Sequence, residues 1–142
     1  MSEIFRDSEH FCEVLVPFFN KLKDDPEMGP KVLASELIIQ FIYREPDAII
    51  SIDCPNSAIL QGEIEQEPDV TMSMAADTAH RFWLGNVNLV VAMTRREIVA
   101  KGPISKIMKL LPIIKNSYAM YREHLKDIGM EIAPEEPEKT TD

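Results

Sequence analysis

The stretch NLVVAMTRREIVAKGPISKIMKLL, residues 88–111, carries several structural signals in immediate succession. Asn88 is a good N-cap for a short helix over residues 89–95. Residues 97–101 then alternate as a strand, and Gly102-Pro103 turns the chain into a very apolar helix. The stretch holds no evident catalytic group, and it has more apolar side chains than one amphipathic helix face needs. This excess indicates a protein that holds an apolar molecule rather than one that makes or breaks bonds.

The length and charge of the chain narrow the classes of function. The 142 residues predict one domain, over residues 1–127, and the 15 basic and 24 acidic residues give a net charge of −9. This charge argues against nucleic acid as a partner and against adsorption on an anionic membrane, because both need clustered Lys and Arg. Residues 128–142 are acidic and poor in apolar residues, so we expect a disordered tail there.

The number of cysteines and the hydropathy of the chain bear on the cellular compartment in which the protein is expected. Cys12 and Cys54 are too few for a disulfide framework. No run of 18 apolar residues is present, so we expect no integral membrane association. The sequence also shows no secretory leader at its start. Together these features predict a protein of the reducing cytoplasm.

The periodicity of apolar residues predicts an α+β fold. Residues 8–23 read as a helix that Pro17 bends. Residues 36–44 fit a strand better than a helix, although periodicity alone leaves both open. The other expected strands are 48–53, 57–64, 69–74 and 97–101, and the other expected helices are a short turn after Pro30, then 77–84, 89–95 and 104–127, the last kinked at Pro112. A run of strands followed mainly by helices favours one sheet with helices gathered on one face.

The order of short motifs in the second half resembles the sterol carrier protein 2 family of lipid-transfer domains. That family has a D-x-T-x-x-M strand, an N-P-x-x-A-F helix, an L-K-I-K-G strand and an A-M-K-L helix start. The corresponding segments here are DVTMSM at 69–74, Asn88 with Ala92-Met93, IVAKG at 98–102 and IMKL at 107–110. The specific part covers residues 69–111, and the remainder up to Asp127 fits the order of elements in the family.

The resemblance implies a fold and also shows where this chain differs from the family. It implies a five-stranded, mainly antiparallel sheet, covered on one face by helices, with a hydrophobic lipid tunnel between the two layers. Leu89 stands where the family has proline, and Arg95-Arg96 stands where a Ser-Gly pair is typical. Val99 replaces an outward lysine, and Gly-Pro replaces a Gly-Asn turn.

A set of apolar residues is expected to line the cavity. Each one taken alone is more typical of an ordinary core position, but the set includes adaptable methionines that suit a ligand of varied shape. The expected lining residues are Phe82, Trp83, Leu89, Met93, Ile98, Met108, Leu111 and Ile114.

Two further features of the same region have alternative interpretations. Arg95 and Arg96 are candidate contacts for an anionic head group, and the alternative is a solvated basic face. Leu110, Ile113 and Met120 form a second apolar strip on the last helix. That strip serves either a homodimer or a helix that is buried on two sides.

Catalytic and metal-binding constellations are weak throughout the chain. The three histidines lie on different elements without the spacing of a zinc site, and Asp77 with His80 reads as a surface pair. No nucleotide-binding or nucleophile motif is present. We therefore expect no enzyme and no metal or other cofactor. The favoured function is a non-catalytic carrier of a sterol, fatty acid or fatty acyl-CoA, and the alternative is an accessory protein-interaction module without a lipid ligand.

Overall fold

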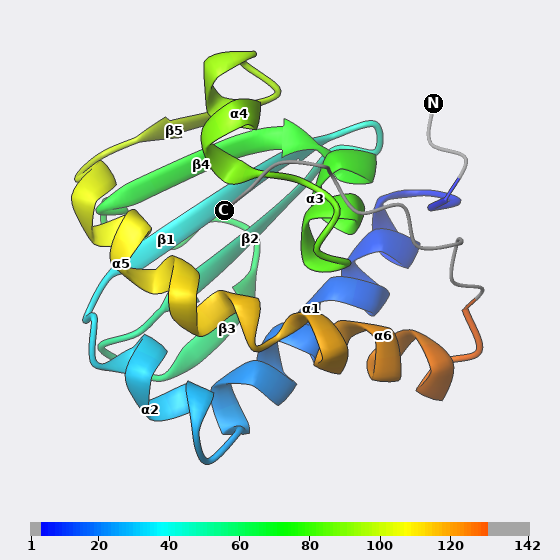
Figure 1. The fold of residues 1–142 in the computed structure, drawn as a ribbon, viewed down its shortest axis with the longest axis horizontal. Helices are drawn as coiled ribbons and strands as arrows, with labels where there is room; N and C mark the ends of the chain where they lie inside the picture. The colour runs from blue at the N-terminus through cyan, green and yellow to red at the C-terminus, as the bar shows by residue number, and fades with distance from the viewer. Residues whose placement is uncertain (1–3, 131–142) are drawn as a thin grey trace.

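The computed structural model describes residues 4–130, and they form one sheet covered by six helices (Figure 1). The predicted tail from residue 131 onward lies outside the described residues. The strands are β1 (Ile38–Arg44), β2 (Ala48–Asp53), β3 (Ala58–Gln61), β4 (Val70–Ala75) and β5 (Ile98–Lys101). The helices are α1 (Ser8–Asp24), α2 (Met28–Leu33), α3 (Ala76–Trp83), α4 (Leu89–Thr94), α5 (Ile104–Lys115) and α6 (Tyr118–Asp127).

The five strands follow the spatial order β3-β2-β1-β4-β5. Three neighbouring pairs are antiparallel and the central pair, β1 with β4, is parallel, so the predicted mainly antiparallel sheet is confirmed. Residues that pair directly share a face of the sheet. Phe41 pairs with both Ile50 and Met72, and Met74 pairs with Ile98, which places all five on the inner face.

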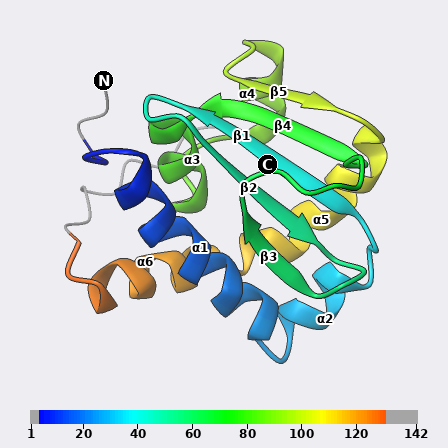
Figure 2. The same cartoon turned by 180° about the vertical axis from the view of Figure 1, so that it is seen from behind.

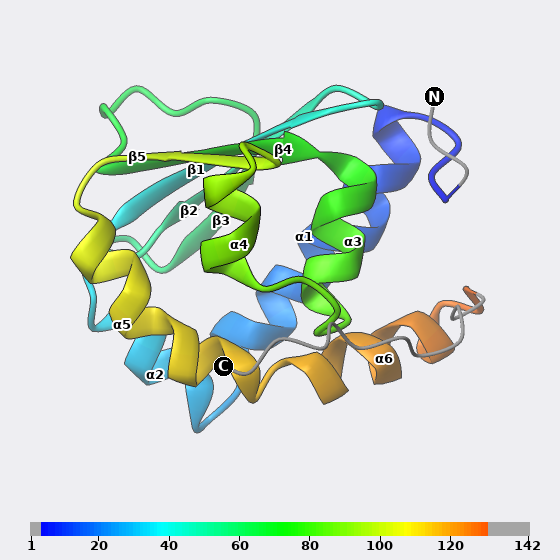
Figure 3. The ribbon, with the colours of Figure 1, turned by 45° about the horizontal axis from the view of Figure 1, so that its top comes forward.

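The helices lie on that inner face, as expected, and the chain crosses the outer face once. Because β3 and β4 are separated by β2 and β1, the connection over residues 62–69 has to pass across both strands. Figures 2 and 3 show this connection on the side of the sheet opposite the helices. Ser51 Oγ donates to Gly62 O at 2.8 Å, which fastens the connection and leaves Ser51 fully buried.

Asp69 joins the parallel pair at the start of β4. Its carboxylate accepts from Ile38 N at 2.8 Å, and its own N–H donates to Ile38 O at 2.8 Å. A carboxylate hydrogen-bonded to a backbone N–H fixes register more firmly than a neutral partner does. This geometry explains the acidic residue that opens the DVTMSM stretch.

One open alternative is settled, and two details differ from the predicted elements. The segment at 36–44 contains a strand, Ile38–Arg44, as favoured, and not a helix. The third strand is shorter than expected, at Ala58–Gln61. The last helix is not continuous, because α5 runs through Pro112 and ends at Lys115, and α6 begins at Tyr118. Asn116 and Ser117 donate to the carbonyls of Ile113 and Ile114, so the last turn of α5 tightens to three-residue spacing before the break.

Helix α1 supplies the aromatic centre of the core. Asp7 caps it through a 2.8 Å bond from His10 N. Its buried stripe includes Phe18 and Phe19. Phe18 lies edge-on to Trp83 at 5.2 Å between ring centroids, and Phe19 stacks on Phe41 at 5.6 Å. The core therefore reaches from α1 to the inner face of the sheet.

Candidate functional site

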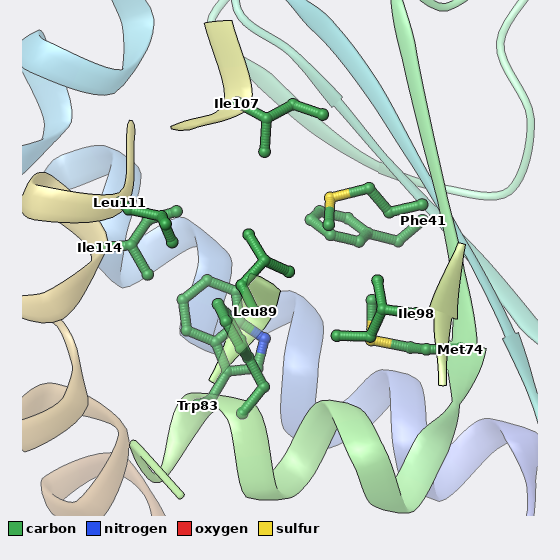
Figure 4. Close-up of a pocket in the computed structure, with 10 residues that line it drawn as sticks. Phe41, Met74, Trp83, Leu89, Ile98, Ile107, Leu111 and Ile114 are labelled. Carbon is green, nitrogen blue, oxygen red and sulfur yellow. The ribbon is translucent and has the colours of Figure 1, made fainter. Parts of the chain in front are cut away.

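An apolar pocket lies between the inner face of the sheet and helices α3, α4 and α5. Figure 4 shows side chains from all of these elements pointing toward a shared space. Every residue that lines the pocket is apolar: Phe41, Met72, Met74, Phe82, Trp83, Leu89, Ile98, Ile107, Leu111 and Ile114. An apolar chamber of this kind desolvates a hydrocarbon and offers no group that attacks or protonates it.

The pocket owes its position to three local features of the sequence. The inner-face residues of β1, β4 and β5 form its floor, because alternation along each strand directs every second side chain inward. Helix α3 ends where Gly85 takes a positive φ of 86°, the expected C′ glycine. Asn88 then caps α4 through a 3.0 Å bond from Val91 N, which brings Leu89 into the pocket wall.

Six of the eight expected lining residues lie around this pocket: Phe82, Trp83, Leu89, Ile98, Leu111 and Ile114. The other two, Met93 and Met108, do not line it. Both are half-buried and pack against the core instead. On α5 the neighbouring Ile107 takes the place that we expected for Met108. Whether the six residues contact a ligand remains a prediction.

The four lining residues that the sequence analysis missed include three on the sheet. Phe41, Met72 and Met74 come from β1 and β4. The only signal in the sequence is the alternation that directs these side chains to the inner face of the sheet, and ordinary core residues show the same alternation. Their place beside the pocket depends on the parallel pairing of β1 with β4, which joins segments about 30 residues apart.

The pocket has a volume of about 40 Å³. Sites for drug-sized molecules are typically about 300–1,000 Å³. Its walls therefore have to separate before an acyl chain or a sterol can enter. The described residues thus form a small pocket, and the predicted tunnel stays a prediction.

Comparison with known proteins now identifies the family. Residues 19–115 match the SCP-2 sterol transfer family. The chain belongs to this family. No curated protein matches the sequence. The resemblance predicted from the motifs at 69–111 is thus confirmed, and the match extends back into α1.

Solved SCP-2 structures share the fold at low sequence identity. The apo sterol carrier protein 2 of Yarrowia lipolytica has a TM-score of 0.60 and 17% identity, covering 83% of this chain and 96% of its own. The sterol carrier protein domain 2 of Helicoverpa armigera has a TM-score of 0.65 and 14% identity, covering 84% and 93%. The Aedes aegypti sterol carrier protein 2, solved with palmitate, has a TM-score of 0.52 and 18% identity, covering 68% and 90%.

The turn between α4 and β5 shows how this SCP-2 family member accommodates its unusual arginines. Arg96 has a φ of 61°, a left-handed conformation that favours glycine. This is the place where the resemblance predicts the glycine of a Ser-Gly pair, so the turn keeps its shape with arginine in it. Arg95 and Arg96 are both exposed and neither lines the pocket. Their contact with an anionic head group remains a prediction.

A buried polar pair lies on the α1 side of the pocket in this SCP-2 fold. His80 is 3% exposed, and its Nδ1 lies 2.7 Å from the Tyr121 hydroxyl of α6. The predicted surface location of His80 is therefore wrong, because His80 is buried in the core, although Asp77 still acts on it electrostatically. Burial lowers the pKa of His80 to about 4, against a smaller raising effect of Asp77. The imidazole is neutral at ordinary pH.

A second buried histidine fastens α6 to α1. His124 Nε2 donates to Val14 O at 2.8 Å, and Lys21 Nζ lies 2.9 Å from His124 Nδ1. Burial lowers the pKa of His124, with a smaller opposing effect of its bond to Val14. Because Nε2 carries the proton, Nδ1 can accept from the lysine. The geometry gives both buried histidines structural partners.

The second apolar strip is partly used inside the molecule. Leu110 is buried, and Ile113 and Met120 are half-buried against the core. Helix α5 also packs against α2. A homodimer through this strip remains a prediction that a light-scattering molar mass can test.

Two further kinds of feature are absent from residues 4–130. In that part of the chain no group of three or more His, Cys, Asp or Glu side chains is placed to hold a metal ion. None of its helices is long and apolar enough to cross a membrane.

Proposed function

We propose that this protein binds a lipid non-covalently in the pocket between its sheet and helices α3, α4 and α5, and carries it without chemical change. The observation that supports this proposal is a wholly apolar lining contributed by six elements of an SCP-2 family fold. Burying an acyl chain contributes about 0.8 kcal/mol per CH₂, so a chain of modest length binds without an ion pair. Palmitate, the ligand of the Aedes aegypti relative, is a chain of this kind.

The proposal extends to the domain and its location. Residues 1–127 act as one lipid-binding domain, with the apolar ligand a sterol, a fatty acid or a fatty acyl-CoA. Cys12 and Cys54 are both free and buried, which fits the cytoplasmic location that we propose.

Native mass spectrometry of the purified protein tests the carrier function. We expect added masses that leave on organic extraction, and the extracted, ligand-free protein should rebind palmitate or a sterol. Protein that never carries lipid, and that binds none of a panel of fatty acids, fatty alcohols and sterols, would contradict a carrier function.

One observation favours the alternative of a protein-interaction module. The pocket volume of about 40 Å³ leaves little space for a ligand unless the walls move. In that case the helix surface itself is the functional feature, through Ile113, Met120 and their neighbours. The same mass spectra distinguish the two, because an interaction module stays free of lipid.

Arg95 and Arg96 are proposed to meet an anionic head group outside the pocket. The change to test is Arg95→Ala with Arg96→Asn, because asparagine tolerates the φ of 61° at position 96. We expect acyl-CoA binding to weaken about tenfold, the loss of one or two charge-assisted hydrogen bonds, with little effect on a fatty alcohol. Fluorescence titration measures both affinities, and equal losses for the two ligands would exclude the head-group role.

A further inference from the structure

The hydroxyl of Tyr43 is buried in the core without a hydrogen-bond partner in the described part of the chain. Tyr43 is 3% exposed, and its ring packs edge-on against Phe11 with the centroids 4.6 Å apart. Leaving a buried hydroxyl unpaired costs about 1–3 kcal/mol. Phenylalanine would fill the same space without that cost, so the hydroxyl invites a functional explanation.

Two uncharged polar groups act on this hydroxyl. Tyr121 and Cys12 are the polar groups that act electrostatically on Tyr43, and Tyr121 is already bonded to His80. Burial raises the pKa of both tyrosines and lowers that of His80, so all three are neutral over the usual pH range. We call Tyr43, Tyr121 and His80 the polar cluster.

The polar cluster stands directly behind the wall of the apolar pocket. Phe41 lines the pocket and also stacks on the Tyr43 ring, with centroids 5.9 Å apart and planes 8° apart. Met74 lines the pocket and pairs with Tyr43 across β1 and β4. One layer of side chains therefore separates the pocket from the polar cluster. Met74 is long and unbranched, so this layer can rearrange when the pocket expands around a chain.

We propose that the Tyr43 hydroxyl is a hydrogen-bonding subsite at the buried end of the pocket, for a lipid that ends in a neutral oxygen group such as a hydroxyl or carbonyl. The proposal rests on the carrier function above and specifies the ligand class. The lipid oxygen accepts from the Tyr43 hydroxyl, and a lipid hydroxyl can also donate in return.

The chemistry of the polar cluster selects against a carboxylate at this end. A buried carboxylate needs a cation or several donors, and the three members of the cluster are neutral. A neutral oxygen group gains the missing hydrogen bond without the cost of burying a charge. A fatty acid would instead keep its carboxylate outside the pocket, in the solvent. The subsite thus distinguishes ligands by the charge of their oxygen groups.

The test compares Tyr43→Phe with the wild-type protein for two ligands of matched length. The ligands are 1-dodecanol and 1-chlorododecane, whose ends differ in hydrogen bonding much more than in size. Each is titrated against N-phenyl-1-naphthylamine, a neutral fluorescent probe of apolar sites. We expect Tyr43→Phe to weaken dodecanol about fivefold to tenfold, the net value of one hydrogen bond, and to leave chlorododecane unchanged. Tyr118→Phe, which removes a tyrosine hydroxyl outside the polar cluster, should change neither.

Stability supplies a second readout. Without ligand, Tyr43→Phe should unfold at the same temperature as the wild-type protein or a higher one, because it removes an unpaired polar group. Equal effects on the two ligands, or no effect on either, would overturn the subsite and leave the carrier function standing. If neither ligand displaces the probe from the wild-type protein, while the probe itself binds, the carrier function fails and the subsite fails with it.

Discussion

Leu111→Trp should weaken lipid binding at least tenfold and leave the protein folded. Leu111 lines the pocket from α5 and is only half-buried, so a larger side chain there strains the core less than one at a fully buried position. An indole ring in a pocket of about 40 Å³ takes the space that the ligand needs. Keeping two methylenes of the ligand out of the pocket costs about 1.6 kcal/mol of binding free energy, and excluding a longer part of the chain costs proportionally more. We therefore expect at least a tenfold loss of affinity. Titration with the neutral fluorescent probe measures it.

A matched control separates blocking of the pocket from general damage to α5. Ile113 is half-buried on the same helix and does not line the pocket, so Ile113→Trp adds the same ring at a different place. Overpacking costs about 1–3 kcal/mol of stability at either position. We expect the two variants to unfold at similar denaturant concentrations, and only Leu111→Trp to lose the ligand. Unchanged binding by Leu111→Trp would place the ligand somewhere other than this pocket.

The sequence predicts the elements around the pocket better than it predicts the lining itself. Alternation at Val70, Met72 and Met74 identifies β4 and its inward face, and the structure confirms both. Asn88 marks the start of α4 because its side chain caps the helix, and Gly85 marks the end of α3 because the backbone there takes a positive φ. Both requirements can be recognised from a single sequence. These signals work because they depend on residues close together in the chain.

Long-range pairing explains most of what sequence reasoning missed. Phe41 has the same inward phase as Ile39 and Tyr43, and nothing local says which of them borders a cavity. The parallel pairing with β4 decides it by placing Met72 beside Phe41. On α5, Ile107 and Met108 are both apolar neighbours. The rotation of α5 about its axis turns Ile107 toward the pocket. The sequence does not predict this rotation, because α5 carries apolar residues on more than one side.

The interpretation of His80 failed for a related reason. Its spacing from Asp77 fits a surface pair on α3, and local sequence contains no sign of Tyr121, 41 residues further along. The helix turns His80 toward α6 because Ala76, Ala79 and Trp83 share that buried side. Polar residues whose partners come from distant elements are the ones that a single sequence does not place.

Stability should fall on mild acidification because of His80. An unfolded histidine takes up a proton below about pH 6.5, whereas the folded one does so only near pH 4. Between these values the unfolded state binds more protons than the folded state does. Each unit by which the pH falls in this range therefore lowers the free energy of unfolding by about 1.4 kcal/mol. The loss reaches roughly 3 kcal/mol at pH 4. His124, whose pKa burial also lowers, acts in the same direction.

Comparison with His80→Gln isolates this contribution, because the carboxylates that titrate in the same range are common to both proteins. Urea unfolding at several pH values from 7.5 to 4 gives the free energy of unfolding for each. At pH 7.5 the variant should be less stable by about 1 kcal/mol, the net value of the hydrogen bond to Tyr121. As the pH falls, the wild-type protein should lose stability faster, and the two curves should cross. Parallel curves would mean that His80 is protonated equally easily in the folded and unfolded states, and that the polar cluster is open to water.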